Sequence, residues 1–276
     1  ELMIEYELEP EIYSFTGLKE FIAALDRMGV SNYSVHIKID SGMHRLGFTP
    51  NEIPELISML KQNKMIKVRS IFSHLAASDE AEHDNFTQHQ IDTFAKTCNE
   101  IAQSIGYTPI RHILNTGGIE RYPNAQFDMV RLGIGLYGIS STQQDKLLPV
   151  STLKSRIIQV KHLNEGETIG YSRKGKVTRP TTVITIPIGY ADGLNRKLSN
   201  GIGKMLVKGK LVPTIGNISM DTCTIDATGI DVAEGDEVTI FGANPTIYDV
   251  AKALETIPYE VLTSISRRVT RIYYQE

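Results

Sequence analysis

The first half of the chain alternates between helix-type and strand-type patterns, and this alternation limits the folds open to it. Apolar residues at helical spacing over Leu18–Met28 stop at Gly29, and the strand-type run Ser34–Ile39 follows. A capping signal at Thr49–Glu52 starts the next predicted helix, and Lys67–Ser73 is the next predicted strand. Repeated helix and strand units of this kind imply a parallel sheet whose strands are joined by right-handed crossovers.

The same alternation continues as far as about residue 145. We predict a long helix over Asp84–Ile105, ended by Gly106, and strands over Ile110–Leu114 and Phe127–Leu132. The pattern contains about five strands, whereas a (β/α)8 barrel needs eight. It therefore predicts either an open sheet or a barrel of which about three strands precede residue 1.

Polar side chains follow the predicted strands at the points where the strands end. In parallel sheets this is the edge at which α/β proteins bind ligands and carry out chemistry. The residues of this kind, spread over four successive units, are Lys38, Arg45, His74, Asn115, Thr116 and Arg131. We expect the functional site at this edge.

The pattern changes around Gln143–Val150, beyond which Gly and Pro punctuate short β-rich runs. We therefore expect a (β/α) domain over residues 1–145 and a mostly β domain over residues 146–276. The predicted strands of the second domain are Ser155–His162, Thr182–Ile188, Lys204–Val207, Thr222–Asp226, Glu237–Phe241 and a final strand, Arg271–Tyr274. We also predict helices near Ile247–Leu254 and Glu260–Ser264.

Composition excludes several classes of protein. Charged residues make up 22% of the chain and apolar residues 41%, which is typical of a soluble globular protein. The net charge of −3 gives no general attraction to nucleic acid or to an anionic membrane, and no apolar run reaches the roughly 18 residues of a membrane span. Cys98 and Cys223 are isolated and lack metal or disulfide spacing, so we expect a reduced, cytoplasmic protein without a metal site.

Four candidates for chemistry each keep a simpler alternative. The run Arg131–Gly135 can hold a phosphate on its backbone N–H groups, or can be a tight turn after a strand. His74 can be functional or structural, and Asn115–Gly118 can cradle an anion or form a turn. Tyr171 can be an acid or base if neighbouring cations stabilise its phenolate, or an exposed tyrosine of a hairpin.

Several longer motifs occur in an order that closely resembles the alanine racemases. They are Lys38–Phe48, Ser73–Glu80, Asn115–Thr116, Val130–Gly138, Gly170–Tyr171, Ile188–Gly193, Gly216–Asp221 and Arg267–Tyr273. The resemblance implies a (β/α)8 barrel that binds pyridoxal 5'-phosphate, followed by a β domain, in a head-to-tail homodimer with shared active sites. It also implies the interconversion of L- and D-alanine, which supplies D-alanine for peptidoglycan.

The resemblance further implies roles for individual residues. Tyr171 is similar to the tyrosine base that enters the partner's site, and Arg131 to the arginine that faces the pyridine nitrogen. His74 resembles the histidine that bridges these two residues. Arg45 resembles the arginine near the cofactor's phenolic oxygen and the substrate carboxylate. Lys38 matches a lysine that is carbamylated in some members and positions that arginine.

The remaining implied roles concern cofactor binding and substrate access. Thr116 with the backbone of Gly133 and Ile134 matches the phosphate cradle, and His112 would pack close to the cofactor ring. The residues that match the substrate entrance are Tyr190, Asp79, Arg196 and Met220, with Met220 close to the substrate carboxylate.

The second base of the family is the lysine that also bonds the cofactor, and no lysine here has its Lys-Ala-Asn-Ala-Tyr-type context. We therefore expect that lysine upstream of residue 1, so that this chain is a fragment and is inactive alone. Arg267 and Ser219 depart from residues common in the family, which leaves details of phosphate contact and substrate access open.

Three alternatives remain. A broad-specificity racemase for serine or other small amino acids would need only a different pocket volume. A related amino-acid decarboxylase would place an acidic residue where Arg131 stands. A non-catalytic, single-barrel carrier of pyridoxal phosphate would lack the second domain.

Overall fold

The computed structural model describes residues 1–274 and divides the chain into two compact units. Unit 1 contains Glu1–Leu136 and Ser140–Leu147, and unit 2 contains Tyr137–Ile139 and the residues from Leu148 onward. Each unit has a hydrophobic core of its own. No described helix is long and apolar enough to cross a membrane.

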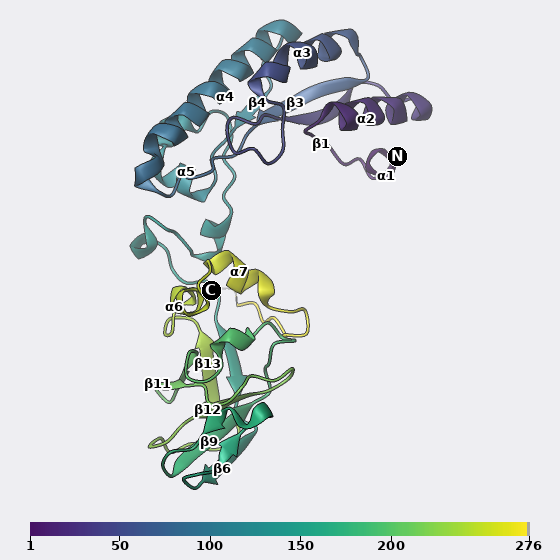
Figure 1. Ribbon diagram of the computed structural model, residues 1–276. Coiled ribbons are helices and arrows are strands. Elements are labelled where there is room, and N and C mark those ends of the chain that lie inside the picture. Colours follow the sequence, from purple (N-terminus) through teal and green to yellow (C-terminus); the bar gives the residue numbers. More distant parts are fainter. Residues whose placement is uncertain (275–276) are drawn as a thin grey trace. The chain divides into compact units, whose positions relative to one another are not determined.

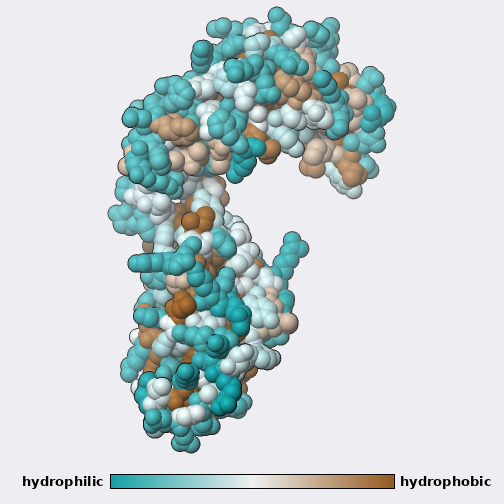
Figure 2. All heavy atoms as spheres, in the orientation of Figure 1, coloured by the Kyte–Doolittle hydropathy of each residue, from teal (hydrophilic) through white to brown (hydrophobic). Residues whose placement is uncertain are grey.

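Unit 1 is built on a parallel sheet with the strand order β1-β2-β3-β4. Its strands are β1 (Glu11–Ile12), β2 (Tyr33–Lys38), β3 (Ile66–Phe72) and β4 (Ile110–His112). Its helices are α1 (Leu2–Glu5), α2 (Phe15–Met28), α3 (Ile53–Gln62), α4 (Asp84–Ile105) and α5 (Thr116–Arg121). Helices α2, α3 and α4 lie along one face of the sheet (Figure 1), and hydrophilic residues cover much of their outer surface (Figure 2).

The helices of unit 1 begin and end where the local chemistry predicts. The Ser14 hydroxyl accepts a hydrogen bond from Gly17 N–H at 3.2 Å at the start of α2, and Gly29 ends that helix with a φ of 66°. Thr49 and Glu52 form the predicted capping box ahead of α3. The structure confirms these signals. They occur at helix ends because they satisfy backbone groups that the first and last turns leave unpaired.

Burial of apolar side chains between the sheet and the helices holds unit 1 together. Val35, Ile37 and Ile39 alternate along β2 and its end, and all three are at most 1% exposed. They pack in one core with residues of α2 such as Leu18 and Leu25. Each such side chain contributes roughly 1.5–3 kcal/mol on burial, so this alternation fixes which face of β2 meets the helices.

A bulge in β3 turns part of that strand over. Val35 pairs with Val68, but the next residue of β2, His36, pairs with Ser70, so Arg69 is left between them. Because side chains alternate along a strand, the extra residue moves Ser70 to the face opposite Val68. The bulge therefore determines that Ser70 pairs with His36.

The predicted strand Phe127–Leu132 is wrong, and the sheet has four strands rather than about five. The segment does run beside β4, with Asp128 N–H bonded to Arg111 O at 3.1 Å and Arg131 N–H bonded to Leu114 O at 3.0 Å. A ladder does not form because β4 is only three residues long and the segment starts at Phe127 with a φ of 50°.

Unit 2 is mostly antiparallel β structure with two helices. Its sheets have the orders β11-β10-β13-β5, β12-β9-β6 and β7-β8. The strands are β5 (Leu153–Arg156), β6 (Gln159–Leu163), β7 (Thr168–Ile169), β8 (Gly175–Lys176), β9 (Thr181–Ile186), β10 (Lys204–Val207), β11 (Lys210–Pro213), β12 (Cys223–Asp226) and β13 (Glu237–Phe241). The helices are α6 (Ile247–Leu254) and α7 (Pro258–Ser264).

Two strand predictions in unit 2 are wrong. The run Ser155–His162 is divided between β5 and β6, which belong to different sheets. Ile157 N–H bonds Asp236 O and Ile158 N–H bonds Thr185 O, so the chain changes sheet between these residues. The run Arg271–Tyr274 is not a strand; the Arg271 guanidinium instead donates to backbone carbonyls, including Ile265 O at 3.0 Å.

Candidate functional site

Arg131 is the centre of a polar cluster at the carboxyl edge of the unit 1 sheet. Its Nη2 donates to Ser73 O at 2.6 Å and to Ile113 O at 3.3 Å, and its Nη1 donates to His112 O at 3.2 Å. Its Nη1 also lies 2.6 Å from His112 Nδ1, and its Nη2 lies 3.3 Å from His74 Nδ1. The structure thus brings together three predicted site residues from separate segments of the chain.

Both imidazoles beside Arg131 are neutral at pH 7. Burial lowers the pKa of His74 to about 4, aided by the charges of Arg131, Arg45 and Lys38. Burial lowers the pKa of His112 to about 4 as well, again aided by Arg131. A neutral imidazole offers one acceptor nitrogen, and both histidines use Nδ1 to accept from the guanidinium.

An aromatic ring supports the same cluster. The ring of His112 stacks on Phe72 with centroids 5.1 Å apart and planes 5° apart. Arg131 lies over the same Phe72 ring at 5.4 Å, and Lys38 Nζ lies at 5.2 Å from its centroid. Burial also lowers the pKa of Arg131, but a guanidinium remains protonated in proteins.

Lys38 is buried and engages a carboxylate that the sequence did not suggest. Its Nζ lies 2.8 Å from Glu11 Oε1, and the residue is 8% exposed. Arg45 lies in the exposed turn that follows β2, and its charge contributes to the low pKa of His74. These two predicted residues therefore belong to the same edge as Arg131.

A line of polar side chains continues from His112 across the sheet. His112 Nε2 lies 3.1 Å from Ser70 Oγ, which lies 2.6 Å from His36 Nδ1. His36 Nε2 lies 2.9 Å from Glu9 Oε2. The sequence analysis missed these three residues, although the alternation of β2 put His36 on the face of Lys38.

Thr116 is the first residue of α5, and its side chain binds the glycine-rich run Arg131–Gly135. Its Oγ1 accepts from Gly133 N–H and from Gly135 N–H, each at 3.2 Å. The neighbouring Asn115 caps α5 by accepting from Gly118 N–H at 2.9 Å. Because the Thr116 oxygen accepts both bonds, its hydroxyl proton is free to be donated to an anion, whereas Gly133 N–H is already engaged.

The candidates for the substrate entrance lie in both units. Asp79 is exposed in unit 1, and its Cβ would lie 3.2 Å from a Cβ added to Gly117. In unit 2, Tyr190 N–H donates to Ser219 O at 3.1 Å, and Ala191 N–H donates to Met220 O at 3.0 Å. Tyr190 and Met220 are therefore neighbours, and both are about half exposed. Arg196, also in unit 2, is exposed at the start of a short 3-10 helix.

Tyr171 lies in an exposed loop of unit 2. The residue is 73% exposed, and Ser172 and Arg173 after it have φ values of 58° and 51°. Asn217 Nδ2 donates to Tyr171 O at 3.3 Å, which ties the loop to a neighbouring segment. Its phenol is thus presented to the surroundings of unit 2 rather than packed in its core.

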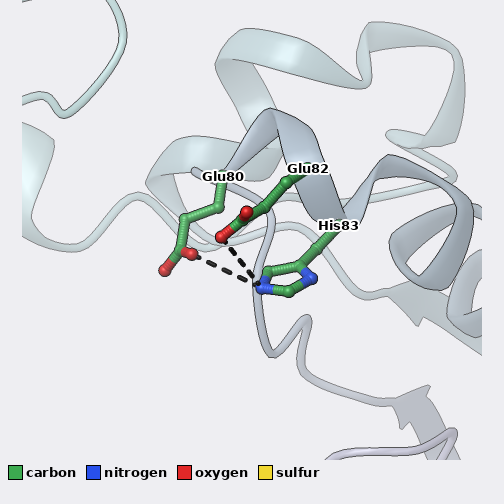
Figure 3. Close-up of side chains that lie close together, drawn as sticks. All are labelled: Glu80, Glu82 and His83. Atoms are coloured by element: carbon green, nitrogen blue, oxygen red, sulfur yellow. Dashed lines mark ion pairs between the residues drawn. The ribbon is translucent and has the colours of Figure 1, made fainter.

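One group in residues 1–274 has ligand atoms close enough together to suggest a cation site. It consists of Glu80, Glu82 and His83 (Figure 3). His83 Nε2 lies 3.5 Å from Glu80 Oε2 and 3.6 Å from Glu82 Oε1, and all three side chains are exposed. Exposed ion pairs of this kind are common, and we assign these residues no further role.

Comparison with known proteins identifies the family. The model of the alanine racemase N-terminal domain matches residues 1–141, and that of the C-terminal domain matches residues 150–273. The chain belongs to the alanine racemase family. It is 39% identical to alanine racemase 2 of Caldanaerobacter subterraneus over 280 residues, which cover 98% of this chain and 71% of that protein.

Solved alanine racemases have the same fold. The enzyme of Streptomyces coelicolor superposes with a TM-score of 0.92 at 31% identity, covering 99% of this chain and 74% of that one. The enzyme of Bartonella henselae, solved with covalently bound pyridoxal phosphate, superposes with a TM-score of 0.87 at 30% identity, covering 99% and 75%. The parallel sheet and the β unit of this chain are thus parts of the barrel-plus-β-domain fold of alanine racemases.

Proposed function

We propose that this chain binds pyridoxal 5'-phosphate and serves in the interconversion of L- and D-alanine. The observation that supports this most is the arrangement around Arg131, where a buried guanidinium is held at the carboxyl edge of the sheet by two neutral histidines. Because the chain belongs to the alanine racemase family, racemisation of alanine is the first candidate function. An amino-acid decarboxylase is disfavoured because the corresponding position would carry an acidic residue.

The residues of unit 1 fit the cofactor at two points. Within residues 1–274, hydrogen bonds occupy both Nη atoms of Arg131 but not its Nε–H, so one donor remains for the nitrogen of a pyridine ring. The hydroxyl proton of Thr116 is free for a phosphate oxygen, close to the backbone of Gly133 and Ile134. When bound, pyridoxal phosphate supplies an electron sink that makes the Cα proton of an amino acid acidic.

Arg131 controls how strong that sink can be. Arginine keeps its proton, so a ring nitrogen that accepts from Arg131 stays unprotonated. A weaker sink favours the return of a proton to Cα over competing reactions. His74 and His112 support this role because, as neutral acceptors, they leave the positive charge on the guanidinium.

Tyr171 is proposed as the base for one face of the substrate. Tyr171 is exposed on unit 2. A group that acts in the site of a partner subunit must be exposed in this way. We therefore propose a homodimer in which each chain lends its Tyr171 to the other. As the phenolate, Tyr171 takes the Cα proton on one face and becomes the phenol, which returns the proton there in the reverse direction.

Further residues are proposed to hold and admit the substrate. Arg45 supplies a cation for the amino-acid carboxylate, and Lys38 positions it from the same edge. Met220, Tyr190 and Arg196 in unit 2, and Asp79 in unit 1, are proposed for the substrate entrance. No lysine of the chain has the context of the family's cofactor lysine, so we propose no residue here for covalent attachment or for the second base.

The cellular role that we propose also comes from the family. D-Alanine is a building block of peptidoglycan, so we propose a cytoplasmic enzyme that supplies it. The assay below also tests whether the substrate range includes serine.

The proposal is tested with the full-length protein and pyridoxal phosphate. Chiral chromatography follows D-alanine formed from L-alanine, with L-serine as a second substrate. Tyr171→Phe should lose nearly all activity, while Tyr6→Phe, which alters another exposed tyrosine, should keep it. A folded, cofactor-loaded protein that leaves L-alanine unchanged would refute the proposal.

A further inference from the structure

A continuous line of polar contacts leads away from Arg131 across the sheet of unit 1. It runs from Arg131 Nη1 to His112 Nδ1 at 2.6 Å, and from His112 Nε2 to Ser70 Oγ at 3.1 Å. It continues from Ser70 Oγ to His36 Nδ1 at 2.6 Å, and ends on an ion-pair contact of 2.9 Å between His36 Nε2 and Glu9 Oε2. We call these five residues the Arg131–Glu9 relay; it joins the segments around β4, β3, β2 and β1.

The two ends of the relay determine where every proton lies. A guanidinium can only donate, so His112 Nδ1 must accept and the proton of a neutral His112 is on Nε2. A carboxylate can only accept, so His36 Nε2 must carry a proton. His36 Nδ1 is then free to accept from the Ser70 hydroxyl, whose oxygen accepts from His112 Nε2–H.

Every bond of the relay therefore points the same way, from Arg131 to Glu9. A second donor on His112 Nδ1 would face the guanidinium N–H groups at 2.6 Å with no acceptor between them. Hydrogen bonds aligned in one direction polarise and strengthen one another in a buried site. Ser70 and His112 are 1% and 5% exposed, so water has little access to the middle of the relay.

We propose that Ser70, His36 and Glu9 are positioning residues that hold the ring of His112, in the Nε2–H tautomer that Arg131 requires, and thereby fix Arg131. This inference rests on the proposed role of Arg131 at the cofactor ring. With His112 Nδ1 fixed as an acceptor, Nη1 is held, while Ser73 O, Ile113 O and His74 Nδ1 hold Nη2. The Nε–H is left as the donor for the ring nitrogen.

The relay also leaves the Nε–H of Arg131 free of a carboxylate. The hydrogen-bond partners of Arg131 in the described chain are carbonyl and imidazole groups, and none is a carboxylate. Glu9 lies at the far end of the relay, where it is one-third exposed and also 3.4 Å from Arg69 Nε; the carboxylate whose charge raises the pKa of Arg131 is Glu11. The arginine is thus stabilised without a carboxylate that would compete for its Nε–H.

The test uses the full-length protein labelled with ¹⁵N-histidine, with and without pyridoxal phosphate. Histidine ¹⁵N shifts distinguish the two neutral tautomers and the imidazolium. In the unaltered protein His112 should be a single Nε2–H tautomer. Ser70→Ala should keep this tautomer, because Arg131 still needs an acceptor at Nδ1, but should shift the ¹⁵N resonance of His112 Nε2, whose N–H loses its acceptor. Ser41→Ala, which removes another buried hydroxyl outside the relay, should leave His112 unchanged.

Activity and cofactor absorption give the second readout. Ser70→Ala leaves the buried Nε2–H of His112 without an acceptor. An unpaired buried group costs enough free energy to change a rate about 10-fold, so we expect kcat for alanine to fall by about that factor. The variant should alter the absorption spectrum of the bound cofactor, while the KM for alanine changes little. Ser70→Thr, which retains the hydroxyl, should restore both.

Glu9→Ala keeps the inference testable if Ser70→Ala does not fold, because Glu9 is partly exposed and tolerates truncation. It should shift the His36 Nε2 resonance and, through Ser70, the Nε2 resonance of His112. A His112 Nε2 resonance that is unchanged in both variants would overturn the inference. If the unaltered protein does not racemise alanine, the proposed function fails, but the histidine spectra still decide whether the relay exists.

Discussion

Lowering the pH from 8 to 5 should destabilise unit 1 through His112. Burial is the main cause that lowers the pKa of this residue from 6.5 to about 4, and the charge of Arg131 adds to it. Between these values the unfolded chain binds a proton that the folded chain does not bind. The free energy of unfolding therefore falls as the pH drops below 6.5 and levels off below about 4.

The size of this effect follows from the two pKa values. A separation of about 2.5 pH units corresponds to about 3 kcal/mol when both states are fully protonated, and to about 2 kcal/mol at pH 5. His112 is only 5% exposed, so solvent screens this contribution little. His74 should add a smaller amount of the same sign, because it is less completely buried.

Hydrogen exchange of amides in β2, β3 and β4, corrected for intrinsic rates, measures the stability of unit 1 at pH 8, 6 and 5. His112→Gln is the comparison, because its amide can accept from Arg131 and donate to Ser70 without titrating. The unaltered protein should lose about 2 kcal/mol more than this variant between pH 8 and 5. His162→Gln, an exposed residue of unit 2, is the control. Equal losses in the unaltered protein and in His112→Gln would refute the reasoning.

Three further predictions follow from close approaches, burial and hydrogen bonds. Gly47→Ala should lower the free energy of unfolding by about 2–4 kcal/mol, because a Cβ there would lie 2.7 Å from Asp40 N at a φ of 123°; an unchanged thermal midpoint would contradict this. Burial raises the pKa of Cys98 and of Cys223 to about 12, so neither thiol should react with a disulfide reagent at pH 8 until urea is added. Thr116→Val should weaken binding of pyridoxal phosphate about 10-fold in a fluorescence titration, because it removes the hydroxyl that holds the glycine-rich run; equal affinity would exclude a phosphate at this point.

Patterns that depend on neighbouring residues were readable from the sequence. Helix α4 spans the predicted residues Asp84–Ile105, and β10, β13 and α6 also match their predicted bounds. Periodicity, capping residues and glycine stops are local signals, and tertiary contacts did not override them here. The edge on which Lys38, His74 and Arg131 meet was predicted for a related reason, since parallel strands end on one side of a sheet.

Features that depend on strand pairing could not be read in this way. The bulge at Arg69 reverses the alternation of β3, so the spacing of Ser70 from Val68 suggested the wrong face. Glu9 and Glu11 precede or begin a strand of only two residues, which is too short to give a period. The change of sheet between Ile157 and Ile158 likewise leaves no signal, because the run Ser155–His162 contains no Gly or Pro that would mark a break.

The most direct test of the central claim is the exchange of the Cα proton of alanine. The full-length protein with pyridoxal phosphate is given L-alanine in D₂O, and ¹H NMR and chiral chromatography follow the product. We expect deuterium at Cα together with equal final amounts of L- and D-alanine, and loss of both in Tyr171→Phe. A folded, cofactor-loaded protein that leaves the Cα proton of alanine in place would contradict the account.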